Sequence, residues 1–115
     1  MKELDEVMSQ LQTQNQQLQG IMSQKQNYML QMHELETALE HLAGVKDQKV
    51  YKAVGPIIIE TGKSDVVKEL EESKEDADLR IKTLESQEEK MKKKMKETQK
   101  KFQDMAENYR DGEGG

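Results

Sequence analysis

The feature that most constrains this chain is a hydrophobic repeat in its C-terminal half. The repeat begins at Val67 and steps alternately by three and four residues, without a slip, as far as Tyr109. Ten of its thirteen positions are apolar, and the flanking positions are overwhelmingly charged. Six heptads of this kind predict a long coiled-coil helix. The positions are Val67, Leu70, Lys74, Ala77, Ile81, Leu84, Glu88, Met91, Met95, Thr98, Phe102, Met105 and Tyr109.

The composition leaves two classes open, disorder and long helices. Only 33% of the 115 residues are hydrophobic and 36% are charged, with one Phe, three Tyr and no Trp. Such a chain cannot fill a compact core, but it can bury one narrow seam between helices. Because a disordered chain has no reason to keep a heptad period, the repeat favours helices.

The N-terminal half repeats the pattern less strictly. Up to residue 22 the same stepping runs through Leu4, Met8, Leu11, Asn15, Leu18 and Met22. From residue 21 a frame shifted by one position fits better, through Ile21, Lys25, Tyr28, Met32, Leu35, Leu39 and Leu42. The sequence therefore predicts a three-residue slip, a stammer, which locally overwinds a supercoil. Gly44 is the predicted stop of this helix.

Between the two helices lies "VYKAVGPIIIE", residues 50–60. Its β-branched residues flank the breaker pair Gly55-Pro56, which predicts two short strands joined by a tight turn at a glycine of positive φ. Val54 then pairs with Ile57. A lone two-stranded hairpin is marginal in water, and its open apolar edges invite further strands. The expected assembly residues are Val50, Tyr51, Val54, Ile57, Ile58 and Ile59.

The predicted fold is mainly α: an antiparallel coiled-coil hairpin with a β-hairpin at its bend, which joins an oligomeric β-barrel platform. Its parts are a helix over 1–43, the assembly element 44–63, a helix over 64–110 and a disordered tail, 111–115. At 1.5 Å per residue each helix is roughly 60–70 Å long, and residue i lies opposite roughly residue 107 − i.

The chain resembles the beta class of prefoldin subunits. The resemblance rests on "VYKAVGPIII" at the bend and "LRIKTLESQEEKM" in the second helix, and it extends over about residues 4–109. It implies that four such chains join two alpha-type subunits through a double β-barrel. It further implies an ATP-independent chaperone whose coiled-coil tips hold unfolded client proteins and deliver them to a group II chaperonin in the cytoplasm.

In that interpretation the two helix ends carry the client surface. Helix ends fray, and exposed methionines suit variable partners. The alternative is an ordinary seam that continues to the ends. The candidate client-binding residues are Met1, Leu4, Val7, Met8, Leu11, Phe102, Met105 and Tyr109.

Other classes of function have weaker support. The chain has no cysteine, and His33 and His41 are too far apart for the i,i+4 spacing of a helical zinc pair. We therefore expect no metal, cofactor or catalytic site, no membrane span, and no enzyme. Seven lysines between Lys90 and Lys101 lack interleaved aromatic residues, and the net charge is −5, so nucleic acid is not an expected partner. Two rivals stay open: a structural tether without clients, and a nucleic-acid-binding helical arm.

Overall fold

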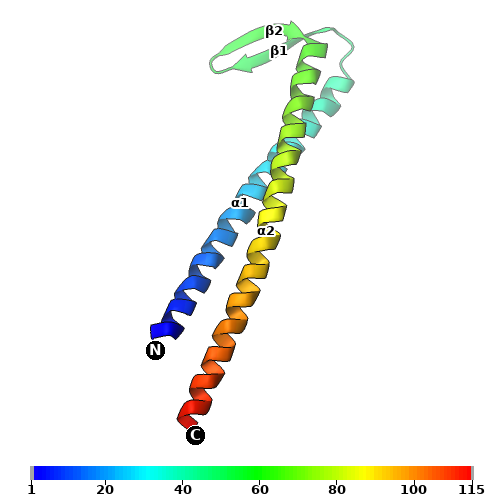
Figure 1. The fold of residues 1–115 in the computed structure, drawn as a ribbon. Coiled ribbons are helices and arrows are strands. Elements are labelled where there is room, and N and C mark those ends of the chain that lie inside the picture. Colours follow the sequence, from blue (N-terminus) through cyan, green and yellow to red (C-terminus); the bar gives the residue numbers. More distant parts are fainter. Residues whose placement is uncertain (1, 115) are drawn as a thin grey trace. The chain divides into compact units, whose positions relative to one another are not determined.

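The computed structural model describes residues 2–114, with side chains as far as residue 110. The order of elements is helix α1 (Lys2–Ala43), strand β1 (Lys49–Val54), strand β2 (Ile57–Gly62) and helix α2 (Lys63–Gly114), as Figure 1 shows. Two long helices that flank one small antiparallel β-hairpin confirm the predicted fold class.

The ends of the elements differ from the prediction in two places. Helix α2 begins at Lys63, one residue early, directly after β2. It also continues to Gly114, where the sequence predicted a disordered tail from residue 111. No proline interrupts this stretch, so the helical hydrogen bonds can continue through its glycines despite their low helix propensity. Met1 and Gly115 lie outside the described residues.

The chain divides into two compact units. The terminal unit is Met1–Lys25 with Thr83–Gly115, and the hairpin unit is Gln26–Lys82. In the hairpin unit three contacts join α1 or the loop after it to α2. Tyr28 lies under Arg80 at 5.8 Å, Glu36 pairs with Lys74 at 3.7 Å, and the Val45 carbonyl accepts a hydrogen bond from Lys63 at 2.5 Å. Residues further along α1 contact residues nearer the start of α2, so the two helices run antiparallel.

The β-hairpin has the predicted register. Val54 pairs with Ile57, Lys52 with Ile59 and Val50 with Thr61. Each strand supplies six residues to the ladder. Gly55 has φ +59°, a conformation that glycine adopts without steric cost, and Pro56 follows it. The two-residue turn fixes which residues face one another, which is why the register could be predicted from local sequence alone.

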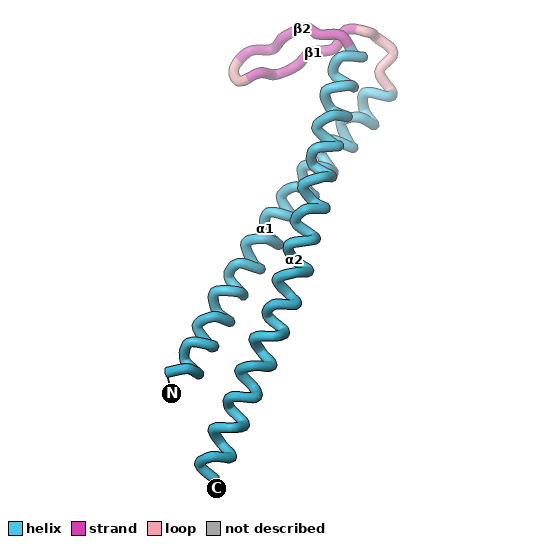
Figure 2. Tube along the Cα trace, viewed as in Figure 1, coloured by secondary structure: helices cyan, strands magenta, loops and turns pink. Residues whose placement is uncertain are grey.

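The chain leaves α1 and enters α2 in different ways. After Ala43 the Gly44 and Val45 amides bond to the His41 and Leu42 carbonyls, which tightens the last turn, and Gly44 keeps a negative φ. A loop over residues 44–48 then leads to β1, whereas β2 passes straight into α2 (Figure 2). The Lys63 amide donates to the Gln48 carbonyl at 2.8 Å and so ties the two entry points together.

Burial along α2 confirms the predicted seam. Every repeat position from Val67 to Met105 is buried or half-buried, and Tyr109 is exposed. Ala77 and Ile81 form the core of the hairpin unit, whereas Val7 and Leu84 form that of the terminal unit. The core is one line of side chains, as the low apolar content requires.

Along α1 the predicted stammer is wrong. Val7 and Gln14 are buried, whereas Met8, Asn15 and Met22, which the predicted frame placed in the seam, are exposed. One uninterrupted frame therefore serves the whole helix. Its buried and half-buried positions are Leu4, Val7, Leu11, Gln14, Leu18, Ile21, Lys25, Tyr28, Met32, Leu35, Leu39 and Leu42. Over residues 4–22 this frame and the predicted one each have five apolar residues in six positions, so the apolar count could not choose between them.

The pairing of the helices in the terminal unit also differs from the prediction. Lys25 was expected to lie opposite Lys82, but its ammonium pairs with Glu88, six residues further along α2. A symmetric count along the chain, with residue i opposite 107 − i, therefore does not give this pairing.

Candidate functional site

The β-hairpin exposes the densest group of large apolar side chains in the described residues. Tyr51 is 70% exposed, Ile58 72% and Ile57 60%, while Val54 and Ile59 are each 47% exposed. Of the predicted assembly residues only Val50 is half-buried. In a single chain both strand edges stay unpaired and these side chains lie in water, an arrangement that invites pairing with a further strand.

The two faces of the hairpin are not equally exposed. Tyr51, Ala53 and Ile58 share one face, and all three are exposed. Val50, Lys52 and Ile59 lie on the other face, where Val50 and Lys52 are half-buried beside the start of α2. The Tyr51 face is therefore the more accessible to another protein.

Ion pairs and hydrogen bonds hold the hairpin against the helices of its unit. Lys52 Nζ lies 2.6 Å from Glu69 Oε1 and joins β1 to α2. Across the strands Lys49 Nζ lies 3.7 Å from Glu60 Oε1. Lys63 contributes twice, because its amide bonds to Gln48 and its ammonium to the Val45 carbonyl. The exposed apolar strands are thus attached to the coiled coil at a defined place.

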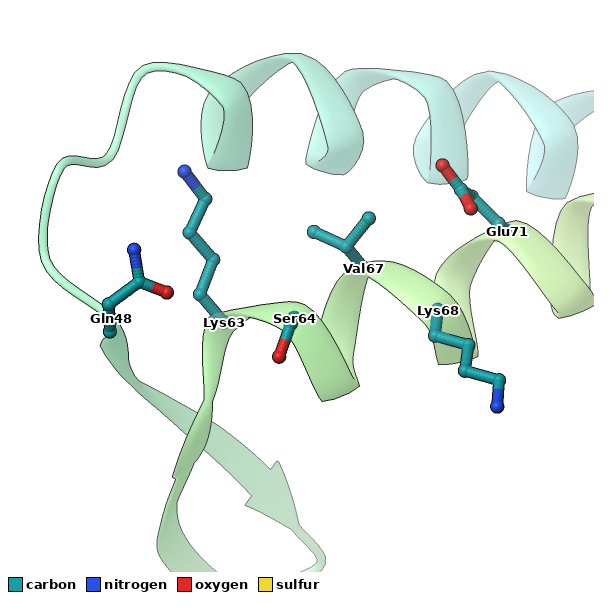
Figure 3. Close-up of a pocket in the computed structure, with 6 residues that line it drawn as sticks. All are labelled: Gln48, Lys63, Ser64, Val67, Lys68 and Glu71. Atoms are coloured by element: carbon teal, nitrogen blue, oxygen red, sulfur yellow. The ribbon is translucent and has the colours of Figure 1, made fainter.

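A surface recess of about 300 Å³ lies where the hairpin meets α2. It is lined by Gln48, Lys63, Ser64, Val67, Lys68 and Glu71. Figure 3 shows Lys63 and Val67 directed toward α1 and Lys68 directed away. Its lining residues do not include a convergent set of a nucleophile, a base and a third group that orients the base.

The predicted client-binding residues separate into packed and exposed groups. Val7 is only 5% exposed, and Leu4, Leu11, Phe102 and Met105 are half-buried in the seam. Met8 and Tyr109 are 47% and 43% exposed. Met1 lies outside the described residues. Of the described candidates, Met8 and Tyr109 are therefore the two with exposed side chains, and the other five are buried or half-buried.

The terminal unit also contains a polar cluster that sequence analysis missed. Lys25 Nζ lies 2.9 Å from Glu88 Oε2, and Lys92 donates to Glu88 Oε1 at 3.0 Å. The Lys25 and Glu88 side chains are only 24% and 13% exposed. The hydrogen bonds from Lys25 and then Lys92 lower the pKa of Glu88, and the bond to Glu88 raises the pKa of Lys25. Both positions were recognised as seam positions, but the predicted register kept them apart.

Metal sites and membrane-spanning helices are both lacking among the described residues. Residues 2–114 contain no group of three or more His, Cys, Asp or Glu side chains placed to hold a metal ion. Within the same residues, no helix combines the length and apolar character that a membrane crossing needs.

Comparison with known proteins identifies relatives over almost the whole chain. The model of the family described as "Prefoldin subunit" matches residues 5–109. The prefoldin subunit beta of Archaeoglobus fulgidus is 43% identical over 104 residues, which cover 90% of each chain. That of Pyrococcus horikoshii is 38% identical over 98 residues, 84% of each chain.

Solved structures agree with these sequence matches. The crystal structure of the prefoldin beta subunit from Thermococcus strain KS-1 superposes with a TM-score of 0.84 at 35% identity, covering 91% of this chain and 93% of that one. The beta2 subunit of the same strain has a TM-score of 0.70 at 22% identity, which shows the shared fold. The open apolar hairpin and the heptad seams are therefore the features of a recognised type of chaperone subunit, and this chain belongs to the prefoldin subunit family.

Proposed function

We propose that this chain is a subunit of an ATP-independent chaperone that holds unfolded proteins and passes them to a group II chaperonin in the cytoplasm. In this proposal four copies join two alpha-type subunits through their β-hairpins. The observation that carries the proposal is the hairpin itself, with five large apolar side chains between 47% and 72% exposed on a sheet of two strands.

The assembly step follows from the physical state of that hairpin. Two strands alone are marginally stable in water, and pairing of their edges with neighbouring hairpins removes both the open hydrogen-bonding groups and the apolar exposure. Burial of apolar surface contributes roughly 25 cal/mol per Å². Closure into a barrel is the arrangement that leaves no edge, so an oligomeric platform is the partner that fits this element.

Client binding is proposed for the ends of the helices, residues 1–11 and 102–109. Met8 and Tyr109 are exposed there, and Met8 is flexible and polarizable enough to contact varied apolar segments. The packed residues Val7 and Met105 become available where the last turns open, because helix ends unfold locally at a free-energy cost near zero. Holding a client in this way requires no nucleotide.

A tether without clients is the second candidate. It is favoured by one observation, the burial of Val7 and the half-burial of Leu4 and Leu11 in a seam that continues almost to the N-terminus. A tether needs only the hairpin and such a seam.

The test combines assembly and activity. The full chain is mixed with an alpha-type prefoldin subunit, and the complex is weighed by native mass spectrometry. We expect a hexamer of four copies and two alpha subunits that suppresses aggregation of a denatured model protein without ATP. A hexamer that gives no protection establishes the tether, and failure to form any complex contradicts the assembly proposal.

A further inference from the structure

The seam of the terminal unit contains polar side chains where a coiled coil ordinarily has apolar ones. Lys25 and Glu88 form the ion pair at 2.9 Å, and Gln14 and Thr98 are only 6% and 7% exposed. These two polar side chains are as buried as Val7 and Leu84, the buried apolar residues of the same unit. Four polar residues in one short seam need an explanation.

Stability does not supply that explanation. An ion pair taken out of water loses hydration that its mutual attraction only partly returns, and well-packed leucines of similar volume are often equally or more stabilising. Buried glutamine has the same difficulty, because Gln14 Oε1 has no hydrogen-bond partner among the described residues. What polar seam residues do well is specify register and partner.

The Lys25–Glu88 pair penalises the nearest alternative registers. If α1 slips by one heptad along α2, Lys25 moves next to Met95 or Ile81, and Glu88 moves next to Leu18 or Met32. Each slip separates the Lys25 ammonium from Glu88 and sets both charged side chains against apolar ones, while Glu88 keeps only its pair with Lys92 on the same helix. Burying a charge that has lost its partner is far more costly than losing a contact between apolar residues.

The second polar pair belongs to the same register. Gln14 lies eleven residues before Lys25, and Thr98 lies ten residues after Glu88. Because the helices are antiparallel, both steps lead to the same level of the seam. Thr98 donates its hydroxyl proton to the Lys94 carbonyl at 3.0 Å, so its oxygen keeps lone pairs for a neighbour. A slip by one heptad sets Gln14 against Met91 or Met105 instead.

We propose that these two polar layers, Lys25 with Glu88 and Gln14 with Thr98, lock the register of α1 against α2 and keep the pairing within one chain. The lock matters because the seam is otherwise a repeat of similar side chains that can match a shifted copy of itself or a helix from another chain. It is independent of the proposed chaperone function.

The test measures register directly in the full-length chain. The sequence has no cysteine, so Gln17→Cys and Lys96→Cys, two exposed positions on α1 and α2 of the terminal unit, accept spin labels selectively. Labelled chains are diluted with unlabelled ones, and electron–electron resonance measures the distance within one chain. The lock predicts one narrow distance for the parent protein. In K25L/E88L it predicts added populations displaced along the axis by about 10 Å, the rise of seven helical residues, or a loss of the in-chain distance.

A matched control removes another ion pair. D78L/K82L deletes the exposed Asp78–Lys82 pair of the hairpin unit, whose separation is 3.0 Å, and is expected to leave the single distance unchanged. Circular dichroism of K25L/E88L is expected to show the parent helix content. One unchanged narrow distance in K25L/E88L overturns the proposal. Loss of helix content in that variant also overturns it, because the pair would then serve stability rather than register.

Discussion

The hairpin unit and the terminal unit use apolar residues in opposite ways. The β-hairpin leaves Tyr51, Ile57 and Ile58 in water, at 70%, 60% and 72% exposure. The terminal unit instead packs most of its apolar residues into the seam and adds an ion pair to it. The hairpin leaves apolar side chains and strand edges uncovered in a single chain, whereas the terminal unit covers most of its apolar residues within that chain. This difference supports the two proposed roles, association at the β-hairpin and selection of register in the terminal unit.

The largest effect is expected from changes to the exposed apolar side chains of the β-hairpin. Ile57→Asp with Ile59→Asp places two charges among the apolar contacts between hairpins, where unpaired charge is expensive. We expect the hexamer with the alpha-type subunit to be lost while circular dichroism still shows the helices. Sedimentation velocity measures the outcome.

Two exposed apolar residues of α1 provide the control for this variant. Met29→Glu with Leu30→Glu adds the same number of charges outside the hairpin, at side chains 51% and 59% exposed, and is expected to leave the hexamer intact. A hexamer that survives the isoleucine changes shows that another element holds the subunits together.

The next effect concerns the terminal unit. Deletion of residues 1–8 and 103–115 removes the exposed Met8 and Tyr109 together with the last turns of the seam, but leaves the hairpin. Assembly is expected to persist, and protection of a denatured model protein from aggregation is expected to disappear at a ratio where the full-length complex protects. Equal protection by both complexes would place the client surface elsewhere.

A smaller effect tests whether the seam ion pair is satisfied internally. Glu88→Leu alone leaves Lys25 in the seam without its carboxylate and is expected to lower the melting temperature clearly. K25L/E88L is expected to recover that loss, because no unpaired charge remains. Thermal unfolding followed by circular dichroism compares the parent, single and double variants. If the double variant is as unstable as Glu88→Leu, the loss has another cause than the unpaired lysine.

The pH dependence of this pair has a defined sign. The lowered pKa of Glu88 means that its contribution to stability is present above its ordinary value, 4.5, and is lost as pH falls through the folded-state pKa. The raised pKa of Lys25 means that its contribution is present below 10.5 and is lost as pH rises through its folded-state pKa. Near neutral pH the parent is therefore expected to melt at a higher temperature than Glu88→Gln, and this difference is expected to shrink in acid. A difference that persists unchanged in strong acid would rule out the charge of Glu88 as its source.

The smallest effect is expected at the ion pair that joins the hairpin to α2. Lys52 and Glu69 are 2.6 Å apart, but their side chains are 43% and 54% exposed. Exposed pairs of this kind contribute roughly 0.2–1 kcal/mol. Glu69→Gln is thus expected to change the melting temperature slightly and to leave assembly unchanged, by the same melting and sedimentation measurements. Loss of the hexamer in this variant would show that the pair sets the hairpin's position.

Local sequence determined much of this protein. The heptads of α2, the register of the β-hairpin with Val54 opposite Ile57 and the positive φ of Gly55 were all predicted, because each depends on residues close together in the chain. The exposed apolar side chains of Tyr51 and Ile58 follow from the same local alternation, and they belong to the surface proposed for assembly.

The tertiary structure alone decided the frame of α1 and the register of the terminal unit. The sequence predicted Met8 and Asn15 for the seam, whereas the structure buries Val7 and Gln14, and the two frames have equal numbers of apolar residues up to residue 22. In the seam of the terminal unit Lys25 is compensated by Glu88, 63 positions away in the sequence. That compensation depends on how the two helices are aligned, and no local pattern in either helix contains this information.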